Sequence, residues 1–185
     1  EIAAIQRRGV EIVTSSPVTS APELLEKGYE AALAAAGAWT PVRMGIEGEA
    51  SARVIEGIAF LKDVNRGEAP PVGTKAVVVG GGNSAVDAAR ACIRMGAKVT
   101  LLYRRTREDM PASPEEVAEA EEEGVKITFL AAPVRIRKGS AVCIRMTPGP
   151  PDDSGRPRPV PVDGSEFSIS CNTVIMAVGQ RANAG

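Results

Sequence analysis

The chain has 185 residues, and its 22 basic and 23 acidic side chains nearly cancel to a net charge of −1. This balance gives a nucleic-acid partner no electrostatic support, and no apolar run approaches the length that spans a bilayer. There is no histidine, which excludes Ser-His-Asp and Cys-His mechanisms.

The first fifty residues predict a strand–helix–strand fragment. We expect a helix over 2–6 and a strand over 10–14. Residues 20–28 predict a short helix whose start has the composition of a capping box. The apolar segment 29–36 follows, and 40–48 is typical of an irregular crossing loop.

A second unit is expected from residue 51 onward, and it opens with a helix over 54–65 that Gly67 closes. Residues 76–79 form an apolar, β-branched run, which is the pattern of a strand buried in a parallel sheet. An amphipathic helix follows, with Asn83 and Ser84 as candidate N-caps, and residues 99–103 predict the next strand. These segments predict one βαβ unit.

The turn of this unit has the pattern G-x-G-x-x-A. The first glycine permits a tight turn, the second lets a pyrophosphate approach the backbone, and the alanine allows close packing of helix on strand. Free amides at the helix start would face the phosphates. An ordinary strand-to-helix turn is the alternative. The candidate phosphate site comprises Gly80, Gly81, Gly82, Asn83, Ser84 and Ala85.

The end of the second strand selects the nucleotide. An NAD site places Asp or Glu there, whereas this chain has Arg104, Arg105 and Thr106, and its first carboxylate is Glu108. Two guanidiniums suit a 2′-phosphate and leave a bare ribose hydroxyl without an acceptor. We therefore predict NADP(H) as the cofactor, with a solvated basic loop as the alternative.

The remainder predicts more strands than helices. A helix over 115–123 is expected, with a capping box at Ser113, and then a third parallel strand over 125–130. Segments 134–137 and 142–146 predict a β-hairpin, with 166–169 pairing against it. The proline-rich segment 148–161 predicts an exposed loop, and 174–178 a last buried strand. The fold class is thus α/β, a Rossmann-like domain with a parallel sheet and an antiparallel layer.

The three cysteines lie far apart in sequence and form no C-x-x-C pair. Each is expected to be a small core residue, and no metal site and no catalytic side chain is predicted within the chain. No signal-peptide pattern stands at the start, so a cytoplasmic location is expected, with no membrane and no nucleic acid as partner.

A set of short motifs together resembles the glutamate synthase small-subunit family, and also corresponding parts of dihydropyrimidine dehydrogenase and ferredoxin:NADP-coupled enzymes. The motifs are Gly37-Ala38-Trp39, the turn 80–87, Tyr103-Arg104-Arg105, Met110-Pro111-Ala112, Glu116-Val117, Glu122-Glu123-Gly124-Val125, Gly164-Ser165-Glu166-Phe167 and Ala177-Val178-Gly179-Gln180. They cover nearly the whole chain. One departure is Ala36, where the family usually has threonine.

This resemblance implies an NADP domain inserted into an FAD domain, with hydride passing from NADPH to FAD and electrons continuing to iron–sulfur centres. Residues 1–50 would be a remnant of the FAD domain, 51–178 the NADP domain, and 179–185 the start of the return. The family's flavin glycine motif would precede residue 1 and its Gly-Asp motif would follow residue 185. Gly179 joins the candidate cofactor-binding residues. The implied partners are the flavin domain of the same parent chain and an iron–sulfur domain or large subunit.

Two other functions share features with this sequence. Thioredoxin reductase has a similar turn and paired arginines, but it would need a C-x-x-C pair shortly before the glycine turn, and residues 51–79 contain no cysteine. A nucleotide-binding regulatory or docking module without redox turnover stays open as the alternative, because the segment carries a cofactor site without a visible catalytic side chain.

Overall fold

The protein is seen in a computed structural model that describes residues 1–153 and 155–182 and divides into two compact units, 1–37 and 38–185. The first unit holds two short helices, α1 (Ile2–Gln6) and α2 (Ala21–Glu26), and no residue of either helix is buried. The division at residue 37 separates two groups of residues that contact mainly residues of their own group. The functional boundaries at 50 and 178 stay predictions.

The core of the second unit is a five-stranded parallel sheet with the strand order β2-β10-β3-β4-β5. Its strands are β2 (Val54–Glu56), β3 (Lys75–Val79), β4 (Lys98–Tyr103), β5 (Lys126–Phe129) and β10 (Thr173–Met176). The sheet confirms the predicted βαβ unit. β3 lies at its centre, where four of its five residues are buried, as continuous apolar runs require.

Three helices cover one face of this sheet: α3 (Gly57–Arg66), α4 (Asn83–Arg94) and α5 (Pro114–Glu122). Alternate strand residues such as Val78, Leu101 and Ile175 point to that face and pack against Phe60 of α3 and the alanine-rich stripe of α4. The small side chains of the stripe let α4 lie close to the sheet. Burial of a residue the size of Phe60 contributes about 1.5–3 kcal/mol to stability.

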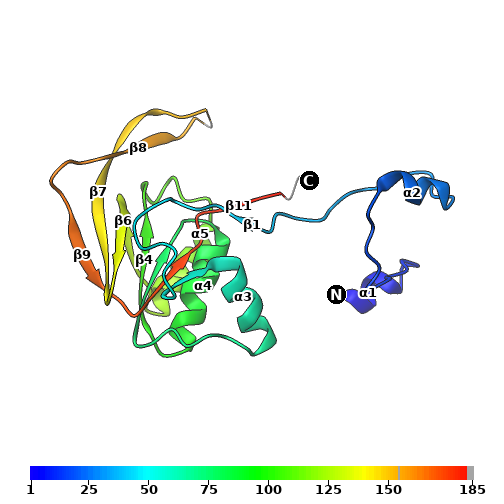
Figure 1. Cartoon of the computed structure of the whole chain (residues 1–185), viewed down its shortest axis with the longest axis horizontal. Coiled ribbons are helices and arrows are strands. Elements are labelled where there is room, and N and C mark those ends of the chain that lie inside the picture. Colours follow the sequence, from blue (N-terminus) through cyan, green and yellow to red (C-terminus); the bar gives the residue numbers. More distant parts are fainter. Residues whose placement is uncertain (154, 183–185) are drawn as a thin grey trace. The chain divides into compact units, whose positions relative to one another are not determined.

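An antiparallel sheet covers the opposite face, so the unit has three layers (Figure 1). Its strands are β6 (Ala131–Arg137), β7 (Ser140–Pro151), β8 (Pro157–Pro161) and β9 (Phe167–Ser170), with β7 pairing all three others. The other set of strand residues, including Val77, Leu102 and Met176, packs against this layer. The predicted fold class, α/β with an antiparallel layer, is confirmed. A further pair, β1 (Thr40–Pro41) with β11 (Gln180–Arg181), lies outside both sheets.

The proline-rich segment is the largest correction. Residues 148–161 were expected to be a loop, but they contribute the end of β7 and all of β8, which pair in an antiparallel hairpin. The register shifts between Pro148 and Pro151, which is the kind of irregularity that lets prolines occur in a strand.

Five local predictions were also wrong. Residues 10–14 and 29–36 form no strand, because no neighbouring strand offers them hydrogen bonds within the described residues. The helix predicted over 54–65 starts only at Gly57, because Val54–Glu56 pairs with β10 as an edge strand. The expected capping boxes are not formed: neither Ser20 nor Ser113 makes a side-chain cap bond, although both occupy the N-cap position.

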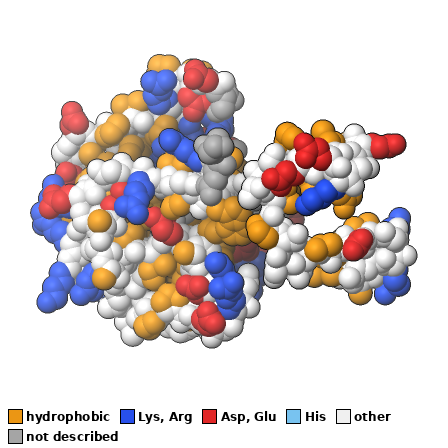
Figure 2. All heavy atoms as spheres, turned by 45° about the vertical axis from the view of Figure 1, so that its right-hand side comes forward, with side chains coloured by type: hydrophobic (Ala, Val, Ile, Leu, Met, Phe, Trp, Pro, Cys, Tyr) orange, Lys and Arg blue, Asp and Glu red, His pale blue; other side chains and the backbone are white. Residues whose placement is uncertain are grey.

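No helix among the described residues is long and apolar enough to cross a membrane. On the face shown in Figure 2, acidic and basic side chains are interspersed over the 38–185 unit and do not segregate into fields of one sign. This pattern agrees with the small net charge of the chain.

Candidate functional site

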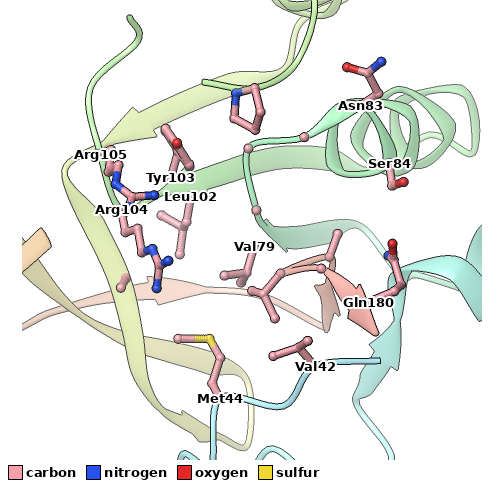
Figure 3. A pocket seen from close by; sticks show the side chains of 18 of the residues that line it. Val42, Met44, Val79, Asn83, Ser84, Leu102, Tyr103, Arg104, Arg105 and Gln180 are labelled. Carbon is pink, nitrogen blue, oxygen red and sulfur yellow. The ribbon is translucent and has the colours of Figure 1, made fainter. Parts of the chain in front are cut away.

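A cavity of about 630 Å³ opens where the carboxyl ends of β3, β4 and β10 meet. Crevices beyond the carboxyl ends of parallel strands are where α/β sheets bind ligands. Figure 3 shows Arg104 and Arg105 on one side of the cavity and Asn83 and Ser84, at the start of α4, on the other. The lining residues are Val42, Arg43, Met44, Val79, Gly80, Gly81, Gly82, Asn83, Ser84, Leu102, Tyr103, Arg104, Arg105, Pro111, Ala131, Ala132, Arg156, Ala177, Val178, Gly179 and Gln180.

The three glycines after β3 differ in whether the fold requires a glycine at their position. Gly80 has φ +148°, and a Cβ there would lie 2.3 Å from the Ala177 carbonyl oxygen, so the turn tolerates only glycine. Gly81 lies close to Tyr103, whose ring would be 2.3 Å from an added Cβ. At Gly82 an added Cβ would meet nothing closer than 4.0 Å, and φ is an ordinary −91°. The fold itself therefore does not require glycine at position 82.

The start of α4 differs in detail from the prediction. The N-cap is Gly82, and Asn83 is the first helical residue, so neither Asn83 nor Ser84 caps the helix. The Asn83 side chain instead accepts a hydrogen bond from the Ser113 amide at 3.2 Å, which ties the turn to the loop before α5. The first amides of a helix have no acceptor within the helix, and here they border the cavity. They can bind an anion, with the helix dipole behind them.

The two arginines after β4 are in unlike environments. Arg104 is exposed, and within the described part of the chain its guanidinium makes no hydrogen bond or ion pair. Arg105 is only 6% exposed, and its Nη2 donates to Asp152 Oδ2 at 2.5 Å. The Arg105 Nε donates to the Pro157 carbonyl at 2.8 Å. Thus one guanidinium is available to a ligand and the other already has partners.

The charge of the lining is one-sided. Among the described residues that line the cavity there are four arginines (Arg43, Arg104, Arg105 and Arg156) and no aspartate or glutamate. In the loop after β4, the Asp109 carboxylate already has a partner, since its Oδ2 accepts a hydrogen bond from Thr106 Oγ1 at 2.8 Å. The lining of this cavity is therefore richer in basic side chains than the nearly neutral chain as a whole.

Eight of the ten predicted cofactor residues line the cavity: Gly80, Gly81, Gly82, Asn83, Ser84, Arg104, Arg105 and Gly179. The other two lie beside it. Ala85 is fully buried in the contact between α4 and the sheet, and the hydroxyl of Thr106 is bonded to Asp109. Whether each residue contacts a cofactor stays a prediction.

Two lining residues, Arg43 and Arg156, were not predicted from the sequence. Arg43 lies near Glu56, with 3.9 Å between its Nε and the carboxylate, and Arg156 belongs to the turn between β7 and β8. Neither has a local motif. Only the long-range pairing of the strands brings them to the cavity.

The cysteines are buried thiols. Desolvation raises the pKa of Cys92, in α4, to about 12, and that of Cys143, in β7, to about 12 as well. Burial also raises the pKa of Cys171. These thiols are protonated near neutral pH, and none lines the cavity.

Two relatives match this chain over part of their own length. It is 44% identical to the NADP(+)-dependent formate dehydrogenase subunit beta of Moorella thermoacetica, in a match covering 99% of this chain and 27% of the relative. It is 35% identical to the glutamate synthase [NADPH] small chain of Azospirillum brasilense, covering 86% of this chain and 36% of the relative. The chain thus spans about a third or less of these two proteins. The resemblance drawn from the sequence motifs is confirmed.

The fold and the family agree. The thioredoxin reductase of T. acidophilum superposes with a TM-score of 0.56 at 18% identity, over 76% of this chain and 41% of that one, which shows a shared fold. Residues 3–185 match the family model described as pyridine nucleotide-disulphide oxidoreductase, which implies binding of FAD and NAD(P)H. The chain belongs to the pyridine nucleotide-disulphide oxidoreductase family.

Proposed function

We propose that this chain carries the NADPH site of a flavoprotein oxidoreductase, in which hydride passes from NADPH to FAD and electrons continue to iron–sulfur centres. The observation that carries the proposal is the cavity itself, which joins the glycine turn of α4 to the arginines after β4. A volume of about 630 Å³ lies in the range of cofactor pockets.

The glycine turn supports a pyrophosphate at one end of this cavity. The protein itself has room for a side chain at position 82. The glycine there is explained by a ligand that approaches the backbone closely. The amides of Asn83 and Ser84 and the positive end of the α4 dipole would hold the phosphates. The residues present therefore fit a dinucleotide.

The arginines support NADPH over NADH. Arg104 is exposed and unpaired within the described residues, and the cavity lining has no carboxylate to accept from a ribose 2′-hydroxyl. A guanidinium matches the 2′-phosphate, whose charge is about −1.5 to −2 near neutral pH.

Replacement of Arg104 tests this assignment. Arg104→Ala should weaken NADPH about tenfold, because one charged hydrogen bond contributes about 1.5 kcal/mol at a partly exposed site, and should leave NADH nearly unchanged. Titration calorimetry with both nucleotides measures the difference. Arg107→Ala is the control, since Arg107 follows the same strand but pairs with Glu121 outside the cavity. Equal losses for both nucleotides in Arg104→Ala would exclude a 2′-phosphate contact.

The redox step needs a separate test. When bound, NADPH supplies the hydride, and this chain's residues bind and orient the cofactor. The relatives named above support an oxidoreductase, since one is named as NADP(+)-dependent and another as glutamate synthase [NADPH]. Reduction of a dye by NADPH, measured on the full-length parent protein with FAD bound, should proceed, and Gly82→Val should abolish it. NADPH binding without flavin reduction would instead favour a regulatory or docking module.

A further inference from the structure

The hairpin formed by β7 and β8 reaches the dinucleotide cavity. Arg156, in the turn that joins these strands, is one of the residues that line it. Hydrogen bonds close the turn: the Asp152 amide donates to the Arg156 carbonyl at 2.8 Å, the Gly155 amide donates to the Asp152 carbonyl at 2.8 Å, and the Arg156 amide donates to Asp152 Oδ1 at 3.3 Å. The backbone of Arg156 is therefore held in a fixed place.

Hydrogen bonds from Arg105 connect this turn to the end of β4. Its guanidinium donates to Asp152 Oδ2 at 2.5 Å and to the carbonyl of Pro157 at 2.8 Å, so it contacts the turn on both sides of Arg156. The side chain is 6% exposed, compared with 24% for Asp152. A buried guanidinium with a matched carboxylate has a structural reason to be there without any ligand.

The turn therefore has two connections, one to the cavity through Arg156 and one to β4 through Arg105. We propose that Arg156 supplies the second cation for the 2′-phosphate of NADPH, beside Arg104, and that Arg105 is a positioning residue that holds the Arg156 turn in place. The two neighbouring arginines thus have separate roles. This inference rests on the proposed NADPH site and names how that site selects its nucleotide.

The consequence is that selectivity depends on the antiparallel layer as well as on the Rossmann-like unit. A 2′-phosphate between Arg104 and Arg156 would be held from two layers of the molecule, β4 of the parallel sheet and the β7–β8 hairpin. NADH lacks this phosphate and would make neither contact.

Calorimetry with NADPH and NADH on the full chain tests the role of Arg156. Arg156→Ala should weaken NADPH about tenfold and change NADH less than twofold. Arg158→Ala is the matched control, because Arg158 lies two residues further along the same hairpin, is exposed and does not line the cavity. It should leave the NADPH affinity within twofold of the parent. If Arg156→Ala and Arg158→Ala behave alike, the proposal is overturned.

A double-variant cycle tests whether Arg105 acts through Arg156. Arg105→Gln should weaken NADPH in the parent chain but add less than a further twofold loss in the Arg156→Ala background, because interacting positions are not additive. Fully additive losses would mean that Arg105 contacts the nucleotide itself, which contradicts a positioning role. Should Arg105→Gln not fold, Arg105→Lys, which keeps the charge and loses the two-sided contact, replaces it in the cycle.

The two proposals fail in different ways. If the parent chain binds neither nucleotide, or if Gly82→Val leaves NADPH binding unchanged, the dinucleotide site itself is wrong. If NADPH binds through the glycine turn but Arg156→Ala has no selective effect, only the role of the hairpin is wrong.

Discussion

Adjacent residues of the same type can have unlike roles, and the glycine turn shows this. Gly80 and Gly81 are required by the fold, through the Ala177 carbonyl and the Tyr103 ring, whereas Gly82 faces open space. The same holds for Arg104 and Arg105, of which only the second is buried and paired. A motif identifies the residues, and their surroundings separate ligand contacts from structural ones.

Substitution of Gly82 should separate binding from folding. Gly82→Val should cost about 1 kcal/mol of stability, as a poorer N-cap, and abolish binding by filling the space that a pyrophosphate needs. Thermal unfolding with and without NADPH measures both, since a ligand raises the melting temperature only of a protein that binds it.

Gly81→Ala is the contrasting variant. Its Cβ would collide with the Tyr103 ring, which is held by a hydrogen bond of 2.7 Å from its hydroxyl to the Asp109 carbonyl. Overpacking of this kind costs about 1–3 kcal/mol, so the melting temperature should fall even without ligand.

A Gly82→Val protein that NADPH stabilises as much as the parent would contradict the phosphate assignment.

The buried thiols should be unreactive in the folded chain. With a pKa of about 12 for Cys92 and Cys143, about one such thiol in 10⁴ is ionised at pH 8. A thiol reagent should therefore label the native protein very slowly and label all three cysteines quickly in denaturant. Rapid labelling of Cys92 in the native state at pH 8 would show that α4 is not packed as described.

At the scale of secondary-structure elements, the parallel sheet and its helices were the most predictable part. β3, β4 and β5 follow from continuous apolar runs, and α4 follows from its apolar stripe and the glycines before it. The edge strand β2 could not be predicted from a local pattern, because its three residues acquire a strand conformation only by pairing with β10, far along the chain.

Long-range pairing also explains why Arg156 was not predicted as a residue of the candidate site. The glycine turn and Arg104 are local signals, readable from a strand, a turn and a helix in succession. Arg156 lies in a segment whose prolines predict a loop, and only the pairing of β7 with β8 and the Asp152 contact with Arg105 bring it to the cavity. Long-range strand pairing has no local pattern from which it could be predicted.

The contact between α4 and α5 should depend on pH. Hydrogen bonding to Arg90 lowers the pKa of Glu123, whose Oε1 lies 2.6 Å from Arg90 Nη2 and 3.1 Å from Arg94 Nη2. Because the folded-state pKa is below the unfolded one, the stabilisation is present above the ordinary glutamate pKa, about 4.3, and is lost as the pH falls through the lowered value.

Glu123→Gln tests this sign. The variant should unfold at lower urea concentration than the parent at pH 7, and the difference should shrink as the pH drops below about 4. Glu122→Gln, at an exposed neighbouring position, is the control and should change little at either pH. If Glu123→Gln lowers the free energy of unfolding by the same amount at pH 7 and pH 3, the ion pair is not the cause of that loss.

At the scale of the 38–185 unit, three layers converge on one cavity. The parallel sheet contributes the ends of β3, β4 and β10, α4 contributes its N-terminus, and the antiparallel layer contributes the β7–β8 turn. Among the described lining residues, Arg104 makes no ion pair and gives this cavity a positive charge that the net charge of the chain does not suggest. Screening by salt should therefore affect an anionic ligand here in proportion to its charge.

The most direct test of the account is the affinity of the unmodified chain for NADPH and for NADH, measured by titration calorimetry at low and high salt. We predict that NADPH binds at least tenfold more tightly at low salt, and that added salt narrows the gap, because the extra affinity comes from charge contacts with the 2′-phosphate. Equal affinity for the two nucleotides at every salt concentration, or a preference for NADH, would contradict the NADPH assignment.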